Sequence, residues 1–175
     1  RWMKEQLYQA SFGIDGQALR PTAPLRVDDP LRGQRLNQSL FSSLTPEWPT
    51  PEGIFQALNE RYHFDLDACA TADNAKCARF FSKAQDALVQ DWTGTVWCNP
   101  PYGREIGRWL KKAYDAAQRG ARVVCLVPAR TDTAWWHDLC MQGDIFFIRG
   151  RLTFGKAQNS APFPSAVVVL SLIHI

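Results

Sequence analysis

A near-continuous apolar run over residues 122–127 constrains the fold of this chain more than any other feature. Successive side chains of a strand point to opposite faces of a sheet, so an apolar run needs cover on both faces. Residues 104–118, just before it, repeat apolar positions with helical spacing, and Gly120 is a typical helix end. A buried strand that follows a helix predicts a layered α/β domain.

Other segments alternate between the helical and the strand pattern. Thr50 and Pro51 are typical of a helix start, and apolar positions continue with helical spacing to Tyr62. Further strands are expected over residues 64–68, 95–98, 144–148 and 166–170, and a further helix over residues 131–141. This alternation predicts one α/β domain with a mainly parallel sheet, in which ligands bind beyond the carboxyl ends of the strands.

The domain is expected to span residues 45–170 of the 175-residue chain, a length that suits a single hydrophobic core. Proline and glycine residues interrupt residues 1–44, which predicts a mobile or loosely packed arm. The arm is rich in arginine and could touch phosphates, but a solvated tail is the favoured interpretation. Residues 171–175 look out of place and are interpreted as a tail outside the domain.

Composition argues against several classes of protein. The five cysteines are odd in number and none forms a Cys-x-x-Cys pair, so neither a zinc site nor a disulfide framework is expected. No apolar stretch reaches the roughly 20 residues that a membrane span needs. Reduced thiols and the lack of a visible signal peptide predict a cytoplasmic protein without a metal. A net charge of +3 tolerates a polyanionic partner without requiring one.

The segment Asn99-Pro100-Pro101-Tyr102 follows the expected strand 95–98 directly and is the candidate catalytic motif. The Asn99 side-chain oxygen and the Pro100 carbonyl can both accept from an exocyclic amine. They would localise its lone pair and stabilise the charge that develops as nitrogen attacks a methyl sulfonium. Consecutive prolines fix the backbone, and the Tyr102 ring can stack on a planar base. The alternative is a plain strand-ending turn.

Seven segments in this order carry a resemblance to a known family: WPTP (48–51), FDLDACA (64–70), NAKC (74–77), DW (91–92), WCNPPY (97–102), LVPARTDT (126–133) and GRLTF (150–154). On these segments, residues 45–170 resemble the phage N-6-adenine DNA methyltransferase family, a Dam-like group. The resemblance implies a Rossmann-like, S-adenosylmethionine-dependent methyltransferase fold. It also implies a site-specific DNA adenine-N6 methyltransferase, encoded by a phage or prophage, that acts in the bacterial host cytoplasm. Such an enzyme flips its target base out of a duplex.

The resemblance also implies which residues bind S-adenosylmethionine. The first group begins at the end of the strand at 64–68 and departs from the glycine-rich form common in methyltransferases: Asp67, Ala68, Cys69 and Ala70, with Asp65 competing with Asp67 for the acidic role. Thr50 and Pro51 resemble a pair placed beside the cofactor carboxylate, where a helix N-terminus binds an anion. Asp91 would accept from the cofactor's adenine amino group with Trp92 nearby, and Asp86 is a candidate ribose ligand. Strand ending and helix capping are the alternatives for these residues.

No separate recognition domain is evident, so DNA contacts are expected from loops around the site. The candidates are Arg104, Arg108, Arg130 and Arg151, which follow the motif or later strands. Neutralising phosphates with such groups makes binding depend on salt. For any one of these residues, a solvated surface charge is the competing interpretation.

Two other kinds of function stay open. The same pocket chemistry suits a methyltransferase for another planar amine, such as an RNA base, cytosine N4 or a protein glutamine. From a different class, the chain could be a non-catalytic DNA-binding protein with a decayed site. The motif residues favour an enzyme, because every polar group that the mechanism needs is present.

Overall fold

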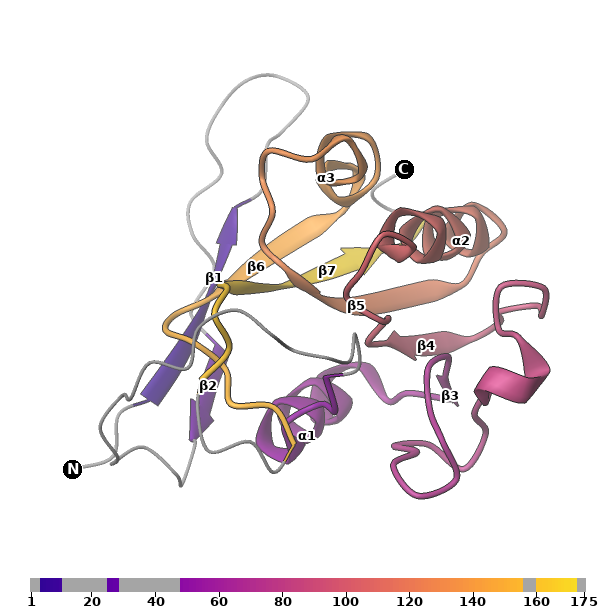
Figure 1. The fold of residues 1–175 in the computed structure, drawn as a ribbon, viewed down its shortest axis with the longest axis horizontal. Helices are drawn as coiled ribbons and strands as arrows, with labels where there is room; N and C mark the ends of the chain where they lie inside the picture. Colours follow the sequence, from indigo (N-terminus) through magenta and orange to yellow (C-terminus); the bar gives the residue numbers. More distant parts are fainter. Residues whose placement is uncertain (1–3, 11–24, 29–47, 156–159, 173–175) are drawn as a thin grey trace.

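A single sheet of seven strands forms the centre of the computed structural model, which describes residues 4–10, 25–28, 48–155 and 160–172. The strands are β1 (Lys4–Ala10), β2 (Leu25–Asp28), β3 (Leu66–Asp67), β4 (Thr95–Cys98), β5 (Arg122–Pro128), β6 (Asp144–Ile148) and β7 (Ser165–Leu170). Their order across the sheet is β2-β1-β6-β7-β5-β4-β3 (Figure 1). The three α-helices are α1 (Glu52–Tyr62), α2 (Ile106–Gln118) and α3 (Ala134–Asp138).

The sheet is mixed, which corrects the expectation of a mainly parallel sheet. The pairs β3–β4 and β4–β5 are parallel, whereas the four other pairs between neighbouring strands are antiparallel. β6 and β7 follow one another in the chain and are also neighbours in the sheet. Their connection has no crossover, so the two strands pair antiparallel. The α/β class is confirmed, and the parallel character is confined to β3, β4 and β5.

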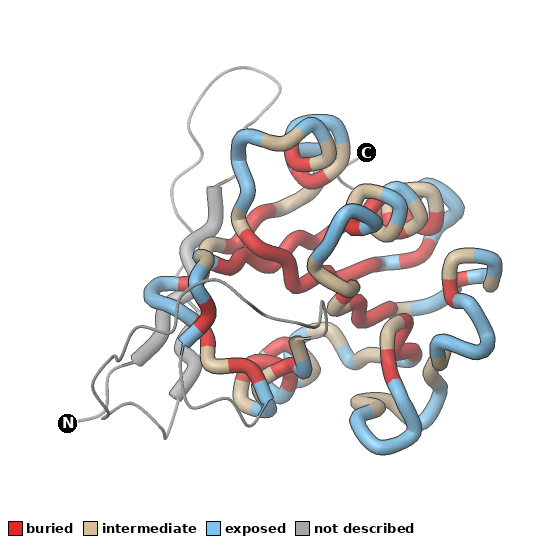
Figure 2. Tube along the Cα trace, viewed as in Figure 1, coloured by how far each residue is buried: buried red, intermediate tan, exposed pale blue. Residues whose placement is uncertain are grey.

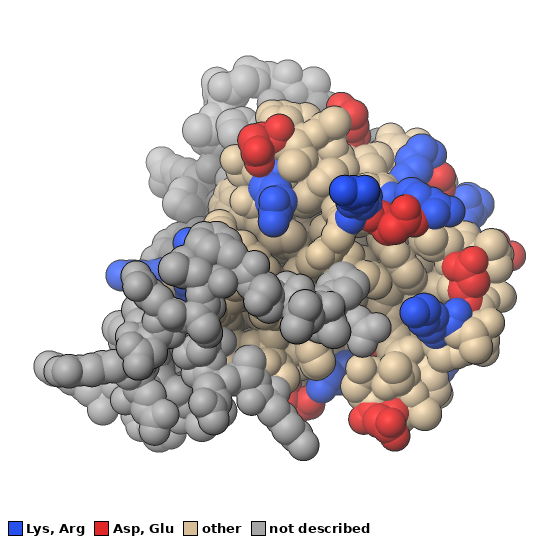
Figure 3. Space-filling view, in the orientation of Figure 1, with Lys and Arg blue, Asp and Glu red and all other residues tan. Residues whose placement is uncertain are grey.

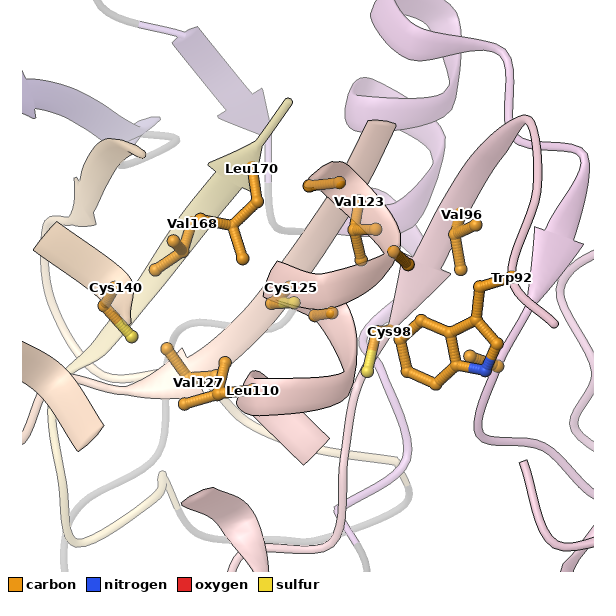
Figure 4. Close-up of a cluster of buried hydrophobic side chains, with 14 of the residues drawn as sticks. Trp92, Val96, Cys98, Leu110, Val123, Cys125, Val127, Cys140, Val168 and Leu170 are labelled. Atoms are coloured by element: carbon orange, nitrogen blue, oxygen red, sulfur yellow. The ribbon is translucent and has the colours of Figure 1, made fainter. Parts of the chain in front are cut away.

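Helices cover both faces of the sheet (Figure 1). On one face, α1 contributes Ile54, Phe55 and Leu58 to a cluster with the side chains of Val124 and Leu126. On the other face, residues of α2 pack against the alternate positions of the same strands, as Figure 4 shows for Leu110 beside Val127. The strands of the centre are buried along their length (Figure 2). The apolar run therefore has the two-sided cover that its sequence predicts.

Several elements lie where the sequence predicts them. α2, β4, β5, β6 and β7 agree with their expected ranges to within two residues. The helix expected over 131–141 is shorter, since α3 ends at Asp138 and a separate 3₁₀ turn covers Cys140–Gln142.

The first 44 residues differ from the expected arm in part. β1 pairs with β6 and β2 pairs with β1, so this segment extends the sheet. A sheet edge offers hydrogen-bonding groups to a short strand whatever its periodicity, which is why the pattern did not indicate these strands. The rest of the expected arm lies outside the described residues. At the other end, Ser171 is buried, and residues 173–175 also lie outside them.

No helix among the described residues is long and apolar enough to cross a membrane.

Gly143, between the 3₁₀ turn and β6, has no room for a side chain. An added Cβ would lie 2.3 Å from the carbonyl oxygen of Val169. We expect Gly143→Ala to lower the free energy of unfolding by about 1–3 kcal/mol, because backbone on both sides must shift. Gly107→Ala is the matched control: its Cβ would meet Trp135 at an ordinary 3.6 Å. Denaturant unfolding of both variants tests this, and equal stabilities would contradict it.

Candidate active site

The ends of β3 and β4 meet at one edge of the sheet. Leu66 pairs with Val96 and Asp67 with Trp97, and the Ala68 N–H donates to the Trp97 carbonyl over 2.9 Å. Asp67 ends β3, and Asn99 follows the last residue of β4. The structure therefore places these two polar residues at the same edge of the sheet.

The Asn99 side-chain amide is held by two acceptors from a distant part of the chain. Its Nδ2 donates to the Trp48 carbonyl over 2.6 Å and to the Thr50 hydroxyl oxygen over 3.0 Å. A backbone carbonyl can only accept, so the amide must present its NH2 group to Trp48. Its Oδ1 consequently faces the other way. This oxygen is buried and has no hydrogen-bond partner.

The Thr50 hydroxyl does not cap helix α1. Pro51 occupies the N-cap position of α1, and no side chain caps the helix. The Thr50 hydroxyl, in a residue only 9% exposed, contacts the Asn99 amide instead. The capping interpretation of Thr50 is therefore wrong, because the hydroxyl lies against β4 rather than over the first turn of α1.

The motif turns sharply after Asn99. Pro100 is buried, and the Gly103 N–H donates to the Pro101 carbonyl over 3.1 Å. The Tyr102 hydroxyl donates to the Leu126 carbonyl over 3.0 Å, which ties the motif to β5. Burial raises the pKa of the Tyr102 phenol well above its ordinary value, so the hydroxyl stays protonated as a donor.

An aromatic cluster surrounds this part of the motif, and sequence reasoning missed it. The Tyr102 ring meets Phe154 and Phe163 edge to face, with ring centroids 6.0 and 5.5 Å apart. Trp48 meets the same two rings at 5.3 and 5.1 Å. Both phenylalanines come from the connection between β6 and β7. Phe154 is the last residue of the matched segment 150–154, a signal that could have pointed to this loop, and Phe163 follows it in the same connection.

The Asp67 carboxylate organises the loop that follows β3. Its two oxygens accept from the N–H groups of Cys69, over 3.1 Å, and Lys76, over 3.0 Å. Asp67 is only 2% exposed, and burial raises the pKa of its carboxyl, an effect that these two N–H groups oppose. The Lys76 side chain also forms an ion pair with Glu52 at the start of α1. The Asp67 carboxylate therefore holds the backbone of this loop by two hydrogen bonds.

The small residues expected to lie close to a cofactor line this loop. Ala68 and Ala70 are buried and Cys69 is partly buried. The Ala70 N–H donates to the Phe81 carbonyl, and Phe80 forms a parallel bridge with Asp67. The chain around Phe80 thus pairs with β3 through a single bridge and forms no full strand there. The few residues between Cys77 and Asp91 leave little room for one.

Asp65 lies at the opposite edge of the sheet from Asn99. Its Oδ2 accepts from the N–H of Thr95, the first residue of β4, over 2.8 Å. Gly94, with a φ of 76°, leaves the room that this contact needs, because a Cβ there would lie 2.5 Å from the same oxygen. The geometry does not bring Asp65 to the site. Its carboxylate fixes the entry into β4.

The other expected acidic ligands are not gathered with Asn99 either. Asp91 is exposed and precedes β4, so the whole strand separates it from Asn99 in the chain. Trp92 is buried, and its Nε1 donates to the Ala87 carbonyl over 2.9 Å, which assigns it to the core. Asp86 is exposed and accepts from the Leu88 N–H in its own turn. Their cofactor roles stay predictions.

The four arginines expected to contact DNA are all exposed. Arg104 follows the motif, Arg130 follows β5 and Arg151 follows β6. These three residues therefore lie in loops at the edge of the sheet that carries Asn99. Arg108 forms an exposed ion pair with Glu105, which is worth little and is easily broken. Among the described residues that Figure 3 shows, basic and acidic side chains are interspersed.

All five cysteines are free, and burial raises the pKa of the Cys140 thiol well above the range of reactive thiols. Among the residues that the structure describes, no group of histidine, cysteine and acidic side chains could hold a metal ion.

The fold and the site define a class: a mixed α/β protein with an Asn-Pro-Pro-Tyr segment at the end of the parallel strand β4. The family model described as "DNA N-6-adenine-methyltransferase (Dam)" matches residues 39–171. The chain belongs to this family.

Two relatives are similar to parts of the chain. A DNA N-6-adenine-methyltransferase of Escherichia phage T1 is 34% identical over 110 residues, which are 61% of this chain and 46% of the phage protein. A putative methyltransferase, YfdM, of Escherichia coli K12 is 38% identical over 64 residues, 32% of this chain and 70% of the relative. The chain thus matches less than half the length of the phage T1 enzyme.

Asp67 gives a test of the loop. Asp67→Ala removes the acceptor of the Cys69 and Lys76 N–H groups, so we expect a loss of about 1–3 kcal/mol in the free energy of unfolding. Hydrogen exchange at these two amides should accelerate beyond that of the β5 amides. Asp73→Ala, an exposed change in the same loop, is the control. Unchanged exchange at both amides in Asp67→Ala would show that other contacts hold the loop.

Proposed function

We propose that this protein transfers a methyl group from S-adenosylmethionine to the N6 amino group of adenine in DNA. The observation that carries the proposal is the Asn99 Oδ1, an acceptor that is buried, oriented and unpartnered. Leaving a buried acceptor unpaired costs about 1–3 kcal/mol, so such an atom calls for a donor from a ligand. An exocyclic amine of a planar base is such a donor.

The strand arrangement supports a Rossmann-like methyltransferase fold. Three parallel strands lie at one side of the sheet, helices cover both faces, and the motif lies where ligands bind in open α/β sheets. The names of the two relatives support a methyltransferase, since one is called a methyltransferase and the other a putative methyltransferase.

The residues beside Asn99 fit S-adenosylmethionine as the methyl donor. The first turn of α1 has no side-chain cap, so its N–H groups are suited to the cofactor carboxylate. The loop after β3 is lined by Ala68 and Ala70, which allow close approach of backbone. Asp67 would hold this loop in shape. When bound, the cofactor supplies an electrophilic methyl group.

The protein's own residues would orient and polarise the amine. Asn99 Oδ1 and the Pro100 carbonyl each accept one N–H of the target amino group, which localises the nitrogen lone pair. As the nitrogen–methyl bond forms and the sulfur–methyl bond breaks, both acceptors stabilise the positive charge on nitrogen. The nitrogen then loses a proton to solvent. No general base is needed before attack, and the remaining acceleration comes from alignment.

The aromatic cluster suits a base that has left a duplex. Trp48, Tyr102, Phe154 and Phe163 supply apolar ring surface beside the Asn99 amide. Base stacking on such rings is worth about 1–3 kcal/mol, which would offset part of the cost of flipping. Arg104, Arg130 and Arg151, on the same side of the sheet, would contact phosphates. The DNA would be that of the bacterial host cell or of the phage.

Methylation of plasmid DNA with labelled cofactor, followed by nucleoside analysis, tests the proposal. The expected product is N6-methyladenine. Asn99→Ala should lower turnover roughly 100- to 1,000-fold, the usual effect of removing one preorganised group, while cofactor affinity by calorimetry stays nearly intact. The reason is that Oδ1 binds the amine and not the cofactor.

Other products would redirect the assignment. Label only in N4-methylcytosine, RNA or protein glutamine would assign one of the alternative amines. Cofactor binding or DNA binding without any transfer would favour a non-catalytic protein. An active Asn99→Ala variant would remove the amide from the mechanism.

Tyr102 gives a second prediction, in a matched pair of variants. Tyr102→Phe keeps the ring and loses only the hydrogen bond to the Leu126 carbonyl. We expect it to retain most activity with a fall of about 1 kcal/mol in the free energy of unfolding. Tyr102→Ala should lose much more activity, because the stacking surface is gone. Equal activities of the two variants would exclude a stacking role for the ring.

A further inference from the structure

The segment Trp48-Pro49-Thr50-Pro51 lies against the catalytic amide through two different oxygens. Asn99 Nδ2 donates to the Trp48 carbonyl and to the Thr50 hydroxyl oxygen. We propose that Thr50 is a positioning residue, which together with the Trp48 carbonyl locks the Asn99 amide in its reactive orientation. This inference rests on the proposed function, and it gives Thr50 a role other than binding the cofactor carboxylate.

The Trp48 carbonyl and the Thr50 hydroxyl restrain the Asn99 amide in different ways. If the amide rotated by half a turn, Oδ1 would take the place of Nδ2, about 2.6 Å from the Trp48 carbonyl oxygen, where two acceptors repel each other. The carbonyl therefore decides which way the amide points. The Thr50 hydroxyl takes the second N–H, so the side chain is held at two points and cannot swing about its terminal bond.

The two prolines explain why these oxygens are well placed. A residue that precedes proline is restricted to extended conformations, and both Trp48 and Thr50 precede one. The segment is also anchored from outside, because the Gly155 N–H donates to the Pro49 carbonyl over 3.0 Å. A Cβ at Gly155 would lie 3.3 Å from the Pro49 ring. A stiff, anchored segment presents both acceptors without the entropy that a flexible one would lose.

Occupying both N–H groups also affects the free oxygen. Hydrogen bonds donated by an amide polarise it, so that its oxygen becomes a better acceptor. Oδ1 is the atom that would receive the amine proton's hydrogen bond, and its strength matters most as charge develops on nitrogen. Loss of the Thr50 contact should therefore lower the rate of the chemical step.

The decisive comparison is Thr50→Val against Thr50→Ser. Valine keeps the shape and removes the acceptor, whereas serine keeps the hydroxyl. We expect Thr50→Val to lower kcat about three- to tenfold, the value of one hydrogen bond, with the Kd of S-adenosylmethionine unchanged. Thr50→Ser should restore most of kcat. Thr95→Val, the same change at the opposite end of β4, should have wild-type kcat and controls for the substitution itself.

Two kinetic results would overturn the inference. One is a Thr50→Val enzyme with wild-type kcat. The other is a loss of activity that a higher Kd for the cofactor accounts for entirely, since that would make Thr50 a cofactor ligand. Melting temperatures of all four proteins separate either result from loss of the fold.

A spectroscopic arm separates this inference from the proposed function. The two side-chain N–H signals of Asn99 can be assigned in an ¹⁵N-labelled sample by their absence from Asn99→Ala. In Thr50→Val one of them should move to the position of a weaker hydrogen bond, and in Thr50→Ser both should stay. If the wild type makes no N6-methyladenine but these shifts occur, the activity proposal fails and the lock stands. If no shift occurs, the lock is wrong.

Discussion

The hydrogen bonds that align β3 and β5 on either side of β4 bring three strand ends to one edge of the sheet. Asp67 and Asn99 share that edge for this reason, and the Leu126 carbonyl that holds Tyr102 belongs to the third strand. The antiparallel strands contribute differently, because the connection between β6 and β7 leaves from the same edge and delivers Phe154 and Phe163. The site is thus a consequence of strand direction.

The polar side chains around β3 and β4 divide into those whose hydrogen bonds are used within the fold and one, the Asn99 oxygen, that has no partner. Both oxygens of Asp67 accept from their own loop, and the Asp65 carboxylate fixes the start of β4. Asn99 is different, since its NH2 group is fully engaged and its oxygen is buried without a partner. A fold normally satisfies such an atom. An exception is expected where a ligand completes the hydrogen bonding.

Sequence patterns located the main elements for identifiable reasons. The apolar run at 122–127 required cover on both faces, and α2 repeats apolar positions at helical spacing, so both lie as expected. The motif ends β4 because proline cannot continue the ladder. The patterns failed for β1 and β2, whose pairing depends on an edge that β6 provides. They also left Asp65 and Asp67 as competing candidates, and the structure places these two residues at opposite ends of the short strand β3.

The sequence by itself determined the layered α/β class, the position of the Asn-Pro-Pro-Tyr segment after a buried strand, and the family to which its ordered segments belong. Those properties depend on local periodicity and on residue identity. Only the tertiary structure decided that Thr50 contacts Asn99 across 49 residues and that four aromatic rings gather beside it. Contacts between segments far apart in the chain depend on sheet order and strand direction, and no local pattern encodes either.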